Sequence, residues 1–231
     1  MKYRSIAIDG PSGAGKSTLA RRLAQKLGFL YVDTGAIYRT VGLAVYRNKI
    51  DPADEGAVAA LLGSLSIAMR YGEDGLQHML LNGEDVTQAI RQNEISGYAS
   101  KVSPIPAVRS FLLEMQRELA RTHNVIMDGR DIGTVVLPQA NLKIYLTAQP
   151  EDRAERRYRE LLERGQQADL AQVLQEVIER DRRDMEREVA PLRQADDAVL
   201  ADTTGLGLEE SFQLLLGMIE SRLYLRGANN E

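Results

Sequence analysis

Residues 10–18 have the types and spacing of a phosphate-binding loop (P-loop). They match the pattern G-x-x-x-x-G-K-[ST] in full: Gly10, Pro11, Ser12, Gly13, Ala14, Gly15, Lys16, Ser17 and Thr18. Glycines let a backbone wrap so that successive N–H groups point at an anion, at a helix N-terminus that already favours negative charge. In this pattern the Lys16 side chain reaches the β- and γ-phosphates, and the Ser17 hydroxyl ligates Mg²⁺. The motif predicts that the chain binds a nucleoside triphosphate.

Three further clusters combine arginine with aspartate. The first is the run from Asp33 to Arg39, and the second runs from Gly129 to Gly133, directly after the apolar run Val125–Asp128. The third lies between Arg180 and Arg187, before Val189-Ala190-Pro191-Leu192. Each has a simpler explanation, because an aspartate at a strand end can cap the next helix and an Arg–Asp run on a helix is usually solvated. Together with the P-loop, the clusters predict two phosphate-bearing ligands.

Three classes of P-loop protein compete for this pattern: a GTP switch, a motor or partner-driven ATPase, and a small-molecule kinase. GTP switches read guanine with D-x-x-G followed by N-K-x-D. Both tetrapeptides occur, as Asp202–Gly205 and Asn48–Asp51, but in the reverse order, and the second follows a helical pattern rather than a core strand. A motor usually brings extra domains, for which 231 residues leave little room. The kinase is the favoured hypothesis.

Composition excludes several other kinds of site. The chain has no cysteine, which excludes disulfides, thiolate zinc sites and cysteine nucleophiles. Its two histidines, His78 and His123, are too few and too scattered for a two-histidine metal motif or a Ser-His-Asp triad. The net charge of −4 argues against a protein that coats nucleic acid or an anionic membrane. Arginine outnumbers lysine 23 to 6, which suits phosphate binding but has an equally good explanation in genomic composition.

The N-terminal residues carry no targeting signal. Met1 to Arg4 lead into a short apolar strand without the apolar core of a signal peptide, and no stretch approaches the ~20 apolar residues of a membrane span. We therefore expect a cytoplasmic protein that acts on small molecules as a monomer, with neither a membrane nor a nucleic acid as partner.

Short apolar runs alternate with helical patterns along most of the chain, as in an α/β domain with a parallel sheet. The expected strands are Ser5–Asp9, Phe29–Val32, Asn124–Asp128, Leu142–Leu146 and Val199–Asp202. The expected helices are Lys16–Leu27, Gly35 to about Arg47, and about Leu208 to Leu225. Five strands flanked by helices suit a doubly wound sheet, which binds ligands at the carboxyl ends of its strands.

Two segments depart from this rhythm. From Leu65 to Thr87 the pattern alternates with period two and has turn signals at Gly72–Gly75 and Asn82-Gly83, which predicts a three-stranded antiparallel meander. An excursion of the main sheet is the alternative.

From Glu151 to Glu188 the pattern is helical, with nine arginines and 12 acidic residues, so a solvated helical hairpin with many ion pairs explains most of these arginines. The nine are Arg153, Arg156, Arg157, Arg159, Arg164, Arg180, Arg182, Arg183 and Arg187.

The motifs together resemble bacterial cytidylate kinases, a branch of the nucleoside monophosphate kinases. The resemblance rests on Gly10–Thr18, Asp33–Arg39, Asp128–Val136 and Glu179–Leu192, and it extends over essentially the whole chain, the antiparallel insert included. The nearest departure, Thr18 at the last position of the P-loop, puts nothing central in doubt. The resemblance implies one P-loop kinase domain with a core of 1–62, 88–150 and 189–231, a nucleotide-binding insert of 63–87 and a helical lid of 151–188.

The resemblance also implies an activity: transfer of the γ-phosphoryl of ATP to CMP or dCMP, with Mg²⁺ at Ser17. It implies catalytic roles for Lys16, Arg130, Arg180 and Arg187, and ATP binding by residues 10–18 together with Arg153 and Arg157. The implied substrate-binding residues are Asp33, Thr34, Tyr38, Arg39, Ser100, Arg109, Arg130, Asp131, Arg180, Asp184 and Arg187. Of these, Asp131, Arg109 and Ser100 would read the base and Asp184 the ribose. For Arg109, a surface position on the helix after Pro106 is the alternative.

Overall fold

The computed structural model describes residues 3–72, 75–163 and 165–223. The chain forms two compact units, the first made of Met1–Leu30 and His123–Glu231 and the second of Tyr31–Thr122. Each unit is described below by itself. The finer division into core, insert and lid that the resemblance implies stays a prediction.

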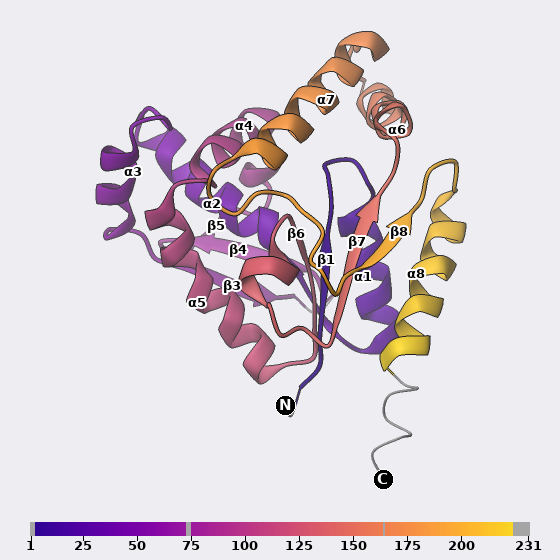
Figure 1. Cartoon of the computed structure of the whole chain (residues 1–231). Coiled ribbons are helices and arrows are strands. Elements are labelled where there is room, and N and C mark those ends of the chain that lie inside the picture. The colour runs from indigo at the N-terminus through magenta and orange to yellow at the C-terminus, as the bar shows by residue number, and fades with distance from the viewer. Residues whose placement is uncertain (1–2, 73–74, 164, 224–231) are drawn as a thin grey trace. The chain divides into compact units, whose positions relative to one another are not determined.

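A five-stranded sheet has the order β2-β6-β1-β7-β8 (Figure 1); β6, β1, β7 and β8 belong to the first unit, whereas β2 begins at Leu30 and continues into the second. The strands are β1 (Ser5–Asp9), β2 (Leu30–Asp33), β6 (Val125–Gly129), β7 (Leu142–Thr147) and β8 (Val199–Asp202). Strand β1 is buried along its whole length and pairs in parallel with β6 on one side and β7 on the other, while β8 pairs in parallel with β7. Because parallel strands end at the same edge, the loops after β1, β6 and β7 lie together there.

Two long helices of the first unit pack on this sheet. Helix α1 (Lys16–Leu27) contacts β1 and β6, and helix α8 (Leu208–Leu223) contacts β7 and α1. Helix α1 ends at Gly28, which adopts a left-handed conformation (φ 67°), as the sequence predicts. A one-turn π-helix, η2 (Ile132–Val136), follows β6 and contacts β6 and β1.

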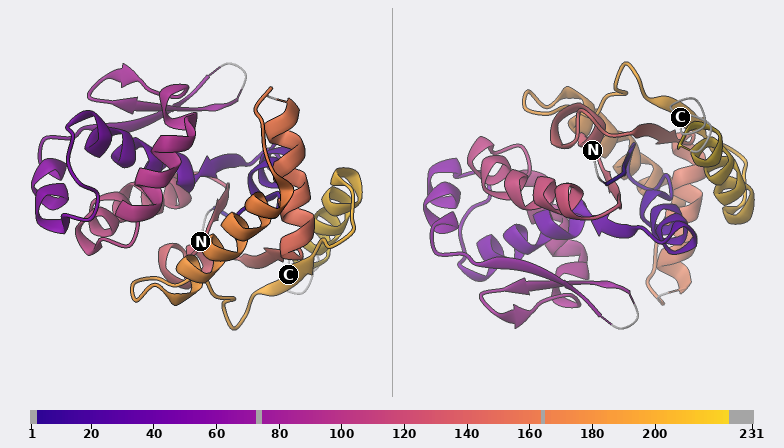
Figure 2. Two further views of the ribbon diagram at one scale, coloured as in Figure 1. Left: turned by 90° about the horizontal axis from the view of Figure 1, so that it is seen from above. Right: turned by 90° about the horizontal axis from the view of Figure 1, so that it is seen from below.

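Helices α6 (Pro150–Glu163) and α7 (Leu170–Glu186) pack against each other (Figure 2). Ala154, Val173 and Val177 form the small buried core between them. The Asp169 side chain caps α7 by accepting the N–H of Gln172. The prediction that this segment is helical is confirmed, while Arg164 lies outside the described residues.

The second unit consists mainly of helices. They are α2 (Thr34–Arg47), α3 (Glu55–Leu62), η1 (Ala89–Arg91), α4 (Asn93–Val102) and α5 (Pro106–Thr122). Helix α2 packs on α4, α5 and η1, and its buried face is a nearly continuous apolar stripe. Strands β3 (Ile67–Tyr71), β4 (Gln77–Leu81) and β5 (Glu84–Asp85) form a separate antiparallel sheet.

The predicted fold class is confirmed: a five-stranded parallel sheet flanked by helices, with an antiparallel meander. In the described residues, β3, β4 and β5 form a sheet separate from the five-stranded one, so the alternative of an excursion of the main sheet is wrong. Two parts of the expected elements, Glu73-Asp74 and the helix end at Leu225, lie outside the described residues. None of the helices in the described part of the chain combines the length and apolar character that a membrane crossing requires.

Candidate active site

The P-loop follows β1 without a spacer, and its backbone demands glycine. Gly10 has φ 153°, and a Cβ atom there would lie 1.9 Å from the carbonyl oxygen of Leu146 on β7. Side-chain atoms never come this close, so only glycine lets the loop leave β1 this tightly against the neighbouring strand. Gly13 (φ 77°) and Gly15 (φ 86°) are left-handed as well, and α1 begins directly after Gly15. The predicted strand–loop–helix is present.

Lys16 lies buried inside this loop. Its side chain is only 5% exposed, and its Nζ donates a hydrogen bond to the carbonyl of Pro11 at 2.6 Å. Burial lowers the pKa of Lys16 well below its usual range, and the positive charges of Arg130 and Arg180 lower it further, while Asp128 and Asp9 raise it. Several cations therefore gather at the P-loop, where a triphosphate would supply the charge that balances them.

Ser17 and Asp128 provide two adjacent oxygen ligands. The Ser17 Oγ donates to Asp128 Oδ2 at 2.8 Å, and Asp128 is 4% exposed at the carboxyl end of β6. Mg²⁺ prefers oxygen ligands and is usually held by one or two carboxylates together with substrate phosphates and water. The two side chains fit such an ion, and Asp128 joins the predicted ligand Ser17 as a candidate.

Asp9, the last residue of β1, ties the P-loop strand to η2. Its carboxylate accepts the N–H groups of Ile132 and Gly133 at 2.7 Å each. Burial raises the pKa of Asp9 from 3.8 to about 6, although these two hydrogen bonds lower it. Arg130 and Asp131 immediately precede η2. By holding the first turn of η2, Asp9 therefore helps to fix the position of the backbone that carries these two residues.

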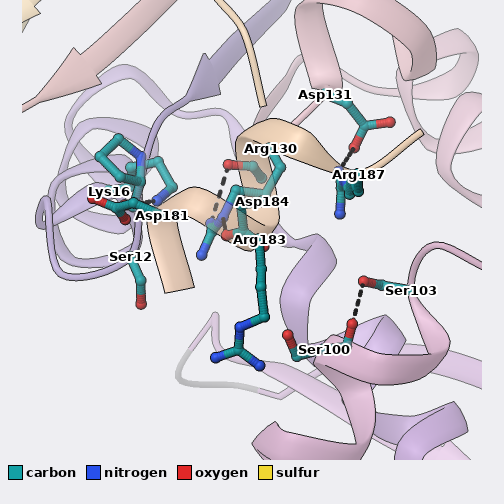
Figure 3. Close-up of polar contacts among 12 residues, drawn as sticks. Ser12, Lys16, Ser100, Ser103, Arg130, Asp131, Asp181, Arg183, Asp184 and Arg187 are labelled. Atoms are coloured by element: carbon teal, nitrogen blue, oxygen red, sulfur yellow. Dashed lines mark hydrogen bonds and ion pairs between the residues drawn. The ribbon is translucent and has the colours of Figure 1, made fainter. Parts of the chain in front are cut away.

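Two arginine–aspartate pairs join this turn to the end of α7 (Figure 3). Arg130 Nε donates to Asp184 Oδ2 at 2.7 Å, and Arg187 Nη2 lies 3.9 Å from Asp131 Oδ1. Arg187 also donates to the carbonyl of Ala190 at 2.6 Å. Burial by itself raises the pKa of Asp184, but the charges of Arg130, Arg180 and Arg187 hold it below its usual value. The predicted residues Arg130, Asp131, Arg180, Asp184 and Arg187 are thus brought together.

The two predicted lid arginines differ in their surroundings. Arg153, in the first turn of α6, is 2% exposed and bonds to Ala148, Ser12 and Asp181. Arg157, one turn later, has a side chain that is 35% exposed and pairs with Glu160 at 3.2 Å. Arg157 therefore has room to meet a ligand, while Arg153 is enclosed by protein.

The second unit holds the other predicted substrate residues. Asp33 caps α2 by accepting the N–H of Ala36 at 2.8 Å, and its other oxygen pairs with Arg39 at 2.9 Å. Gln77 on β4 holds the backbone of Asp33, accepting its N–H at 2.8 Å and donating to its carbonyl at 3.2 Å. Thr34 is buried as the first residue of α2. The capping role considered for a strand-end aspartate is real here, and it coexists with the Arg39 pair.

Arg109 lies inside the second unit. It is 9% exposed, so the alternative of a surface position is wrong. Its Nη1 donates to the carbonyl of Ser103, the C-cap of α4, at 3.2 Å, and its guanidinium lies 5.8 Å from the centre of the Tyr38 ring. Ser103 in turn donates to the carbonyl of Ser100 at 3.2 Å (Figure 3). Arg109, Tyr38 and Ser100 thus form one connected group.

The two tetrapeptides that resemble guanine-reading motifs have ordinary structural roles. Asn48 caps the C-terminus of α2, where its side-chain amide donates to the carbonyl of Ala44 at 2.8 Å. Asp202 ends β8 and accepts the backbone N–H of Thr204 at 2.9 Å, as in an Asx turn. Both side chains thus serve the local backbone, which supports the interpretation of the two tetrapeptides as chance matches.

Comparisons with known proteins agree with the site. The cytidylate kinase family model matches residues 6–221. The chain belongs to the cytidylate kinase family. The cytidylate kinase of Caldicellulosiruptor bescii is 53% identical over 216 residues, covering 94% of this chain and 95% of the relative. That of Carboxydothermus hydrogenoformans is 50% identical over 214 residues, covering 93% and 96%. That of Streptococcus pneumoniae is 44% identical over 223 residues, covering 96% and 100%.

A solved structure shares the fold at low sequence identity. An uncharacterized protein from Eubacterium ventriosum matches with a TM-score of 0.54 and 12% identity, covering 96% of this chain and 100% of that one.

The family model and the curated relatives confirm three predictions: that the chain is a member of the cytidylate kinase family, that it is an enzyme, and that it is a kinase. The switch and motor hypotheses are wrong.

Sequence reasoning assigned no role to three buried carboxylates of this cytidylate kinase family member, although it noted Asp128 as an acid at the end of a strand. Asp9 and Asp128 each end an apolar strand, a pattern that marks an acid at the ligand-binding edge of a parallel sheet. Asp181 lies in a helix crowded with charges, and no sequence signal separates it from its solvated neighbours. All three contact residues that the sequence did identify.

Proposed function

We propose that the enzyme transfers the γ-phosphoryl of ATP to the phosphate of CMP or dCMP, with Mg²⁺ bound at Ser17 and Asp128, giving ADP and CDP or dCDP. The observation that supports this most directly is the gathering of Lys16, Arg130 and Arg180 at the P-loop, where burial and then the charges of the two arginines lower the pKa of the lysine. Such a concentration of positive charge calls for polyphosphate. The choice of a cytidine nucleotide follows from the relatives, which are named cytidylate kinases.

The reaction needs no general base. A phosphate oxygen of the acceptor attacks the γ-phosphorus, and the bond from that phosphorus to the β–γ bridging oxygen breaks. The attacking oxygen is already anionic at neutral pH, so the protein has no proton to remove. Catalysis then depends on aligning the two phosphates and neutralising charge on the transferring group.

The donor is held by the P-loop. Its backbone N–H groups and Lys16 surround the β- and γ-phosphates, and Arg157 meets the nucleotide from α6. When bound, Mg²⁺ would supply further positive charge to neutralise the phosphates. Ser17 and Asp128, already 2.8 Å apart, would hold this ion with little rearrangement.

The acceptor phosphate is the partner of the arginines. We assign Arg130, Arg180, Arg187 and Arg39 to that phosphate or to the transferring group, because a planar guanidinium can donate to two oxygens at once. Asp184 uses one oxygen for Arg130 and would accept the ribose hydroxyls with the other. The assignments of Asp33, Thr34 and Tyr38 to substrate binding stay predictions.

The base is recognised by its donors and acceptors. Cytosine offers an amino donor at N4 and a bare acceptor at N3, and uracil reverses both. Asp131 accepts well from an amino group, whereas Arg109 donates well to N3 or O2, with Ser100 beside it. An unpaired buried polar group costs about 1–3 kcal/mol, so UMP should be disfavoured a hundredfold or more.

ADP release from ATP tests the proposal, measured with CMP, dCMP, UMP, AMP and GMP as separate acceptors. We expect rapid release only with CMP and dCMP, and its loss when EDTA removes Mg²⁺. Rapid ATP hydrolysis without an acceptor, or equal use of AMP, would refute it. The cytoplasmic location and the monomeric state stay predictions; light scattering should give the chain mass of 25.7 kDa.

A further inference from the structure

One guanidinium joins three segments of the first unit that take part in phosphate chemistry. Arg153 Nε donates to the carbonyl of Ala148, just after β7, at 2.8 Å, and its Nη1 donates to the carbonyl of Ser12 in the P-loop at 3.0 Å. Nη1 also donates to Asp181 Oδ1 on α7 at 3.1 Å, while Nη2 binds the second oxygen of Asp181. A Cβ atom at Gly13 would lie only 3.3 Å from the Cβ of Arg153, so the P-loop backbone packs directly on this residue.

These contacts leave Arg153 little capacity for a ligand. Its side chain is 3% exposed, and three of its nitrogens already donate to four protein oxygens. To reach a nucleotide, Arg153 would have to leave the carboxylate of Asp181 buried without its charge partner. Breaking one half of a buried ion pair is strongly unfavourable.

The bond to Ser12 controls a phosphate-binding donor. The carbonyl of Ser12 and the N–H of Gly13 belong to the same planar trans peptide, so they point in opposite directions. By holding this carbonyl towards α6, Arg153 turns the N–H of Gly13 away from α6. The orientation of that N–H is what a P-loop uses to bind phosphate.

Asp181 places the other end of the pair beside the arginines of α7. It follows Arg180 directly and lies three residues before Asp184, on the same face of the helix. Asp184 binds Arg130 at 2.7 Å, so the last two turns of α7 are anchored at two points (Figure 3). Arg180 lies within this anchored stretch of the helix.

We propose that Arg153 and Asp181 are a positioning pair that sets the Ser12–Gly13 peptide of the P-loop and the Arg180 turn of α7 in register for phosphoryl transfer. This inference rests on the proposed function. It assigns Asp181 a role in positioning. It also gives Arg153 the role of holding protein segments in place, instead of the ATP contact that the family resemblance implies. Neither residue touches the nucleotide.

A double-mutant cycle tests the pair: Asp181→Asn, Arg153→Lys and the double variant, with kcat, the KM for ATP and the Kd of ATP measured on each. We expect each single change to lower kcat/KM for ATP on the order of 10- to 100-fold, since small misplacements of reacting groups cost this much. The Kd of ATP should rise in both. The double variant should be no worse than the poorer single variant, because both changes break one unit.

Glu155 and Arg159 provide the matched control. They form an exposed pair on the same helix, with 2.9 Å between Oε1 and Nη2 and side chains that are 39% and 69% exposed. Glu155→Gln and Arg159→Ala should leave all three constants unchanged. Circular dichroism melting shows whether each variant is folded at the assay temperature. If Asp181→Asn does not fold, Asp181→Glu and Arg153→Lys, which keep both charges, serve in its place.

Two outcomes overturn the inference. A weaker Kd for ATP in Arg153→Lys with a normal Kd in the Asp181 variant would mean that Arg153 contacts ATP directly. Normal kinetics in folded variants that merely melt earlier would mean a purely structural ion pair. Failure of the proposed function can be told apart from failure of this inference. In the first case the wild type would not phosphorylate CMP, but the Kd values of ATP for the Arg153 and Asp181 variants would still show whether the pair positions the P-loop.

Discussion

The buried carboxylate of Asp9 should make the stability of the protein depend on pH in an unusual direction. In the unfolded chain its pKa is 3.8, and in the folded protein burial raises it to about 6. Between these values the folded protein holds a proton on Asp9 that the unfolded chain has released. The contribution of this group to stability therefore falls as the pH rises from about 4 to about 6.

The size of the effect follows from the shift of about two pKa units. At 1.36 kcal/mol per unit it amounts to about 3 kcal/mol in total, of which about 2 kcal/mol falls between about pH 4.5 and about pH 7.5. Asp9→Asn has the same shape and no ionisation. Going from pH 7.5 down to pH 4.5, the wild type should gain about 2 kcal/mol relative to this variant.

The assay is urea unfolding of the ligand-free protein at several pH values. The difference in free energy of unfolding between wild type and Asp9→Asn is plotted against pH, so that all groups common to both proteins cancel. A second variant gives a control of opposite sign. The hydrogen bond from Lys143 holds the pKa of Asp197 below its usual value of 3.8, so against Asp197→Asn the wild type should show no change from pH 7.5 to pH 4.5 and should lose stability only when the pH falls below about 4.

A difference between wild type and Asp9→Asn that stays constant from pH 4.5 to pH 7.5 would refute the reasoning. It would mean that the carboxylate ionises as easily in the folded protein as in the unfolded chain. Hydrogen bonds from Ile132 and Gly133 would then compensate fully for burial.

Three further predictions concern activity. Lys16→Ala should reduce kcat by a factor on the order of 10²–10³ without a change in the melting temperature, because the residue serves a ligand; near-normal turnover would contradict its place in the phosphate cradle. Alanine at Arg180 or Arg187 should lower kcat/KM by more than about tenfold, while Arg159→Ala, on an exposed stretch of α6, should not; equal effects would show that location is irrelevant. Asp131→Asn should shrink the ratio of kcat/KM for CMP over UMP, mainly by harming CMP, and an unchanged ratio would mean that the base is read elsewhere.

Local signals explain the parts of the fold that the sequence predicted. The turn at Asn82-Gly83 has positive φ at both residues, 51° and 85°, which is the geometry that Asn-Gly favours between antiparallel strands. The short apolar run Ser5–Asp9 predicts the wholly buried strand β1, and the glycine–lysine motif of the P-loop is recognisable directly after it. Where the conformation is decided within a few residues, the sequence is sufficient.

Long-range contacts explain what the sequence could not show. Residues Ile132–Val136 are mostly β-branched and suit a strand, yet they form a π-helix whose first N–H groups are held by Asp9, 123 and 124 residues away. Within 151–188, nine arginines and 12 acids allow many pairings. Only the packing of α6 on α7 selects Arg153 and Asp181 as a buried pair. The sequence could single out Arg153 only through the family resemblance, which implies an ATP contact rather than this pair.

The buried acids of the first unit answer a question that its chemistry raises. A site for two anionic ligands should avoid carboxylates, yet Asp184 lies behind Arg130 and Asp131 lies near Arg187. A long arginine side chain loses up to about 2 kcal/mol of rotamer entropy when it is fixed, and a backing carboxylate fixes it before the substrate arrives. Because no general base takes part, the rate depends on how accurately cations meet the transferring phosphoryl. The carboxylates weaken the attraction of the site for its anionic ligands, but they hold the arginine donors in place before the substrate binds.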